Sequence, residues 1–174
     1  MKNTESSGKP GLRPPVRSSP AFLLAQVGGR AASQFAQRLQ KIGLAPHHAG
    51  ILRILSASPG ITQQTLAETL GTVPSRLVVL VDELEKKGMV ERRANPHDRR
   101  RYALHVTEKG ASTLAEIGRI AREHSQSLLA ALSSDEQQQL ATFLQRIADQ
   151  QGLTPGVHPG YRRIGESNEK SDSR

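Results

Sequence analysis

Arginine is concentrated in one short stretch of this chain, and its chemistry there limits what the stretch can do. Between residues 92 and 101 a single acid, Asp98, accompanies five arginines: Arg92, Arg93, Arg99, Arg100 and Arg101. A guanidinium group is always charged, is weakly hydrated and donates hydrogen bonds in one plane, which suits phosphate oxygens. The whole chain is also basic, with a formal net charge of +8. These residues therefore indicate recognition of an anionic partner, and nucleic acid is the first candidate.

A helix and two strands are predicted to position the arginines. Pro74 suits the first turn of a helix, and Gly88 suits the residue that ends it. Residues 89–94 then indicate a strand, an Asn-Pro pair signals a turn, and residues 101–107 alternate as a returning strand. A helix followed directly by a basic hairpin suits a protein that places the helix in one DNA groove and the hairpin in the next.

The helix that begins at Pro74 is predicted to have a core face and a face directed at DNA. Four apolar side chains share one face at helical spacing and are expected in the core: Leu77, Leu80, Val81 and Leu84. The candidates for the DNA-binding face near the N-terminus are Ser75, Arg76 and Val79. Ser75 and the helix N-terminus can donate to phosphate, Arg76 suits a guanine edge, and Val79 suits a thymine methyl group. Asp82 and Glu83 oppose deep phosphate contact along this face.

A short helix over residues 62–70, capped by Thr62 and ended by Gly71, precedes the helix at Pro74. Two short helices joined by a turn with glycine form the helix-turn-helix pattern. Further helices are predicted at 20–41, at 46–57, at 108–132 after the cap Thr107, and after a capping box at Ser133 and Glu136. The predicted fold class is therefore mainly α with a small β-hairpin wing, an α+β winged helix-turn-helix.

The two ends of the chain have a different composition from the middle. Residues 1–19, a basic tail, and residues 151–174 are rich in Gly, Pro, Ser and charge, so both are predicted to be disordered. A single domain at 20–150 remains. There is no cysteine, which excludes disulfides and thiolate catalysis. No apolar run approaches the roughly 18 residues of a membrane span, and we expect a cytoplasmic protein.

The order of features in SRLVVLVDELEKKGMVERRANPHDRRRYALHVTEKG, at 75–110, resembles the MarR family of bacterial winged helix-turn-helix regulators. The resemblance covers about residues 20–150. It implies a homodimer paired through dimerisation helices at about 20–42 and 108–150, with the winged helix-turn-helix at about 44–107. Each subunit would place its recognition helix in a major groove and its wing in the flanking minor groove. Many members repress transcription, and many release DNA when a small, often aromatic or phenolic, molecule binds.

The resemblance also implies roles for the wing residues. Arg100 is expected to enter the minor groove, Asp98 to orient Arg100, and Arg99 to meet phosphate or base edges nearby. The alternative is a solvated, charged hairpin that contacts nothing, and the preceding helix argues against it.

Histidines invite a metal interpretation, which the sequence does not favour. His47 and His48 are adjacent on a helix start, so their side chains point about 100° apart, and no HExxH motif is present. We therefore predict no metal site and no cofactor. By the resemblance, His48 and Ala49 lie where an effector pocket would begin; the alternative is that both are packing or surface residues. No phosphate-binding loop or nucleophile elbow is present, so no catalytic residue is assigned and an enzyme is not expected.

The leading hypothesis is a sequence-specific, double-stranded DNA-binding transcriptional regulator. It would be a homodimeric repressor of a pseudo-palindromic operator, released by a small effector. One alternative is an architectural DNA-binding protein of low sequence specificity without an effector. Another is a protein-interaction module built on a degenerate winged helix.

Overall fold

A computed structural model describes residues 18–95, 98–158 and 160–163. The helices in this part of the chain are α1 (Pro20–Gln40), α2 (Pro46–Ala57), α3 (Gln63–Leu70), α4 (Pro74–Lys86), α5 (Glu108–Leu128), α6 (Ser134–Gln150) and α7 (Gly160–Arg163). Strands β1 (Val90–Asn95) and β2 (Asp98–Val106) pair antiparallel. The mainly helical fold with one hairpin confirms the predicted fold class.

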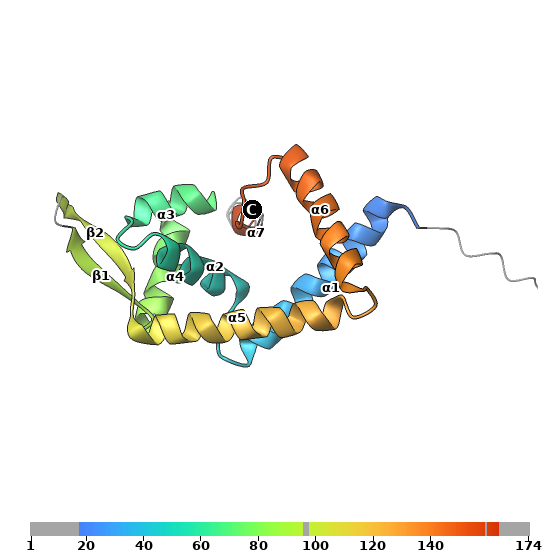
Figure 1. Cartoon of the computed structure of the whole chain (residues 1–174). Helices are drawn as coiled ribbons and strands as arrows, with labels where there is room; N and C mark the ends of the chain where they lie inside the picture. Colours follow the sequence, from blue (N-terminus) through green and yellow to red (C-terminus); the bar gives the residue numbers. More distant parts are fainter. Residues whose placement is uncertain (1–17, 96–97, 159, 164–174) are drawn as a thin grey trace, which may run out of the picture.

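The long helix α5 connects the two ends of the molecule. Figure 1 shows the β1–β2 hairpin at one end, with α3, α4 and α2 behind it, while α6 and the outer half of α1 form the other end. The helix predicted to extend to residue 132 ends at Leu128. The side chain of Gln137 donates to the carbonyl oxygens of Leu129 and Leu132 at 3.3 and 3.0 Å, which stabilises the turn before α6. None of the helices in the described ranges is both long enough and apolar enough to cross a membrane.

Helix starts follow the capping residues expected from the sequence. Thr62 accepts a hydrogen bond from the backbone N–H of Thr65 at 3.2 Å. Thr107 accepts one from Gly110 at 3.0 Å, and the Ser133–Glu136 capping box forms in both directions. Each cap satisfies a backbone donor that the first helical turn leaves without a partner. Local sequence therefore determines where α3, α5 and α6 begin.

The core lies where α2, α3, α4 and the base of the hairpin meet α5. Its fully buried side chains are Leu39, Ile51, Leu52, Leu55, Leu66, Leu70, Leu77, Leu84, Leu104, Val81 and Val90. The four α4 residues predicted for the core are all buried, at 5 % exposure or less. Burying this face of α4 leaves its opposite face directed away from the core.

The hairpin is attached to the helix-turn-helix by backbone hydrogen bonds that the sequence pattern did not predict. Gly60 N–H donates to Leu104 O at 2.9 Å, and Leu104 N–H donates to Ile61 O at 3.0 Å. The residues before α3 thus pair with β2, although the sequence indicated only a helix cap there. On the other side, a Cβ atom on Gly110 of α5 would lie 2.1 Å from Met89 O, so α5 packs directly against the start of β1.

The chain after α6 differs from the predicted disordered tail. Residues 151–158 and 160–163 turn back toward α2, and Figure 1 shows α7 in the space between α2 and α6. Tyr161 is 5 % exposed, and its hydroxyl donates to His47 O at 2.6 Å. Its ring lies against Gly50, where an added Cβ would meet the hydroxyl oxygen at 2.1 Å. The prediction of disorder rested on the polar composition of this segment, which does not reveal that one aromatic side chain is buried against α2. Residues 1–17 and 164–174 of the predicted tails lie outside the described residues.

Candidate nucleic-acid interface

The outward face of α4 presents a mixed polar and apolar surface at its N-terminal half. Ser75 is exposed, and Val78 and Val79 are 38 % and 54 % exposed. The first turn of α4 contains no acid, and no side chain caps its N-terminus. Anions are favoured at such a helix end. The structure therefore brings Ser75 and Val79 together on one accessible face, as the sequence predicted.

The side chain of Arg76 does not project freely into solvent. The residue is only partly exposed, and its Nε atom is buried. It is close enough to His47 of α2 to influence that ring. Burial lowers the pKa of His47, the charges of His48 and Arg76 lower it further, and Glu83 opposes them. Contact between Arg76 and a DNA base remains a prediction, because the Arg76 side chain lies near α2.

Two acids of α4 that the sequence set against phosphate contact each have a basic or histidine partner. Asp82 accepts a hydrogen bond from the Arg92 guanidinium at 2.5 Å. Glu83 lies 2.8 Å from His48 Nε2. The positive charge of Arg92 lessens the repulsion that Asp82 would exert on a nearby phosphate.

The hairpin that carries the arginine-rich stretch has a regular register over most of its length. Val90 pairs with Val106 and Ala94 with Tyr102, and the register shifts between Ala94 and Asn95. Strand β2 begins at Asp98, so the backbone of Asp98, Arg99 and Arg100 is strand, whereas the sequence placed these residues in the turn. Their side chains lie outside the described part, as do Pro96 and His97. Their DNA roles therefore remain predictions.

The two arginines of β1 have opposite surroundings. The side chain of Arg92 is 19 % exposed and turns to α4, whereas that of Arg93 is 60 % exposed and pairs with Glu91 on its own strand. The sequence counted both among the five arginines that indicate an anionic partner. The partners of Arg92 are instead carboxylates of the protein itself, which lie ten and seven residues earlier on a different element.

Helices α2 and α4 bring together three side chains that could be taken for a metal site. The ligand atoms of His47, His48 and Glu83 lie within 4.8 Å of one another. However, His48 Nδ1 accepts a hydrogen bond from Ala45 N–H at 3.1 Å, so in the neutral ring Nε2 carries the proton that is donated to Glu83. Both ring nitrogens of His48 are then occupied by hydrogen bonds within the protein.

The residues expected to begin an effector pocket are both buried at the start of α2. His48 is 5 % exposed and borders an open recess shared with the end of α4, where Lys86 and Lys87 also lie. Ala49 is 7 % exposed and packs in the core instead of lining that recess. The structure thus separates the two candidates, although they are neighbours in sequence.

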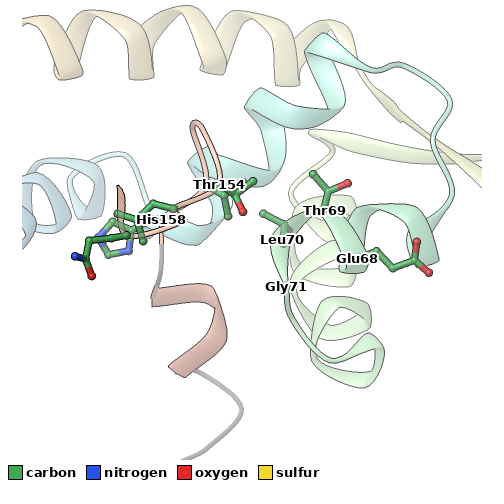
Figure 2. Close-up of a pocket in the computed structure, with 10 residues that line it drawn as sticks. Glu68, Thr69, Leu70, Gly71, Thr154 and His158 are labelled. Carbon is green, nitrogen blue, oxygen red and sulfur yellow. The ribbon is translucent and has the colours of Figure 1, made fainter. Parts of the chain in front are cut away.

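A second, smaller cavity lies between the end of α3 and the segment that follows α6. Figure 2 shows Glu68, Thr69, Leu70 and Gly71 on one side, and Thr154 and His158 on the other. Its volume of about 90 Å³ is small for an organic effector. The sequence could not indicate this cavity, because the later residues were expected to be disordered.

Comparison with known proteins identifies the arrangement. The model of the MarR family matches residues 42–101. A curated Thauera aromatica protein, named provisionally as the transcriptional regulatory protein for the hcr operon, is 36 % identical over 126 residues, which cover 72 % of this chain and 76 % of that protein. The chain belongs to the MarR family. It is therefore a transcriptional regulator and not an enzyme, in agreement with the prediction.

Further known proteins are similar to this chain in sequence or in fold. The HTH-type transcriptional regulator BilQ of Clostridium symbiosum is 28 % identical, with 69 % of this chain and 81 % of that protein covered. The structure of the transcriptional repressor CouR bound to a 23-mer DNA duplex superposes with a TM-score of 0.66 at 31 % identity, covering 75 % of this chain and 92 % of that one. Apo MarR from E. coli, at 23 % identity and a TM-score of 0.67, shares the fold over 75 % of this chain and 96 % of its own.

Proposed function

We propose that this MarR-family regulator is a homodimeric repressor that binds a pseudo-palindromic, double-stranded DNA operator in the cytoplasm and is released by a small effector. The observation that carries the proposal is the outward face of α4, with Ser75 and Val79 accessible beside a basic hairpin. A helix of this kind fits the major groove, and an arginine-bearing wing fits the minor groove. The CouR structure, a repressor on a DNA duplex, supports DNA as the partner.

The terminal helices support a homodimer. Large apolar side chains on both are exposed in the single chain: Phe22, Leu23, Leu24 and Val27 on α1, and Phe143, Leu144 and Ile147 on α6. Exposed apolar surface of this kind marks an interaction site. Pairing through α1, α5 and α6 would bury it and would set two recognition helices about one DNA turn apart.

For the effector, the proposed entry region is the recess beside His48 at the start of α2, and the core residue Ala49 is not part of it. The recess beside His48 reaches α4 through Glu83 and two lysines, so an anionic molecule bound there would contact the recognition helix directly. In this proposal, binding at this point shifts α4 relative to α2, and the shift releases DNA. Small acids, including aromatic ones, suit the two lysines of the recess.

In vitro selection from a random duplex pool tests the proposal. We expect enrichment of one inverted repeat with half-sites about 10 bp apart, and loss of binding in the presence of one member of a panel of aromatic acids. Light scattering of the free protein should give a dimer. Recovery of unrelated sequences with equal affinity would contradict a sequence-specific repressor.

The alternative is an architectural DNA-binding protein of low specificity. It is favoured by the exposed Val78 and Val79, which offer the bases no hydrogen bonds. Competition with random duplex at moderate salt separates the two functions. A specific complex survives this competition, whereas an architectural one is lost.

A further inference from the structure

Arg92 connects the wing to two helices through one guanidinium group. It extends from β1, and its Nη2 atom donates to Asp82 Oδ1 at 2.5 Å and to Gln63 Oε1 at 3.3 Å. Its Nη1 atom donates to Glu85 Oε2. Asp82 and Glu85 belong to the recognition helix α4, and Gln63 is the first residue of α3. One side chain thus links the wing to both helices of the helix-turn-helix.

The spacing of the acceptors explains why arginine is required here. Asp82 and Glu85 are three residues apart on α4, so their carboxylates lie on the same side of the helix. A planar guanidinium with several donors can bond both carboxylates and a third oxygen at the same time. A lysine ammonium is a single point charge on a flexible stem and does not match acceptors spread over two helices.

The position of Arg92 along the hairpin gives this connection mechanical importance. The hairpin is rooted in the core through Val90 and Leu104, which are 2 % and 0 % exposed. Beyond Arg92, both Arg93 and Ala94 are exposed. Arg92 therefore fixes the wing at the point where the hairpin leaves the core. The angle of the wing to α4 in turn determines where the arginines of the wing tip lie.

We propose that Arg92 is a positioning residue for DNA binding. It holds the wing at a fixed angle to α4 and engages the carboxylates that α4 would otherwise present to phosphates, and it does not itself contact DNA. This role rests on the proposed function and adds the part that sets the geometry between the two DNA-contacting elements. It differs from the role expected for the arginines at 99 and 100, which are predicted to touch DNA.

The first test compares Arg92→Ala with Arg93→Ala, the neighbouring arginine that pairs only with Glu91 among the described residues. Both bind a selected operator duplex over a range of salt. Arg92→Ala should weaken binding by about tenfold while the slope of log affinity against log salt stays at the parent value, because no phosphate contact is lost. It should also lose minor-groove protection in a hydroxyl-radical footprint and keep the major-groove protection from α4. A slope reduced by about one would mean direct phosphate contact and would overturn the proposal.

A double-mutant cycle tests whether the carboxylates are the partners that matter. In an Asp82→Asn, Glu85→Gln background, Arg92→Ala should weaken binding by less than about threefold, because the connection is already disrupted. If the full effect of Arg92→Ala persists in that background, Arg92 acts on DNA directly and the positioning role is wrong.

Two further measurements separate the remaining explanations. Circular dichroism and thermal unfolding establish that each variant is folded; if Arg92→Ala is not, Arg92→Lys serves in its place and should remain impaired. Full affinity of Arg92→Lys would show that charge alone suffices and would overturn the role of the guanidinium. A parent chain that binds no duplex specifically would overturn the proposed function itself, and with it the role of Arg92.

Discussion

His48 joins the start of α2 to the recognition helix through the two nitrogens of one ring. Nδ1 accepts from Ala45 N–H, and Nε2 lies 2.8 Å from Glu83 Oε2. We expect His48→Ala to lower the free energy of unfolding by about 1–3 kcal/mol, because the partly buried N–H of Ala45 loses its acceptor. Urea unfolding measures this loss. Glu83→Gln is the matched control, since its amide oxygen can still accept, and an equal loss in that variant would assign the effect to charge.

Arg100 carries the sharpest prediction about DNA contact. Arg100→Ala should cost about 1–3 kcal/mol of binding free energy and lower the salt slope by about one, because a groove-bound guanidinium also releases counterions. Fluorescence anisotropy with a selected duplex at several salt concentrations measures both quantities. Unchanged affinity would remove Arg100 from the interface.

At the scale of residues, the sequence predicted types of chemistry better than it predicted partners. A run of arginines indicates an anionic partner whichever way each side chain points. The difference between Arg92 and Arg93 depends on Asp82 and Glu85 of α4, and it appears only once β1 lies against that helix. The same holds for Glu83, whose partner His48 is 35 residues away.

At the scale of elements, local rules predicted most of the fold. Caps at Thr62, Thr107 and Ser133 and the apolar face of α4 follow from interactions within a few residues, so the sequence alone contains them. Two contacts were missed for one reason. Ile61 pairs with Leu104, and Tyr161 packs on α2. Each contact joins residues far apart in sequence, so no local pattern predicts it.

The packing of Tyr161 on α2 gives a prediction for these two elements. Gly50→Ala places a methyl group where the Tyr161 hydroxyl now lies, so the segment after α6 should be displaced. Burial raises the pKa of Tyr161, so its docking is stable below the ordinary phenol value of about 10 and weakens as the pH rises past it. In a Tyr102→Phe background, ultraviolet titration should show phenolate formation at lower pH after Gly50→Ala.

Gly29→Ala on α1 is the control for that experiment. A Cβ atom there meets nothing within 4 Å, so the titration of Tyr161 should not change. If Gly50→Ala also leaves the titration unchanged, Tyr161 is not held against α2 in solution.

At the scale of the whole molecule, the exposed apolar faces of α1 and α6 predict that two chains pair to form the DNA-binding protein. Phe143→Lys should convert the dimer to a monomer and abolish cooperative operator binding, because a charge would be buried in the apolar contact. Light scattering and a mobility-shift assay measure the two effects. Gln138→Lys adds the same charge on the opposite side of α6 and should change neither.

The segment after α6 has one more consequence, which concerns competition. Because it is tethered to the same chain, Tyr161 occupies its site on α2 at an effective concentration of about millimolar or above, and no free molecule begins with that advantage. If an effector instead binds α2 at His47 and Gly50, where Tyr161 lies, its apparent affinity is reduced, because only chains from which Tyr161 has withdrawn can accept it. Removing the residues after Gln151 would then make the regulator more sensitive to its signal without altering any residue of α2.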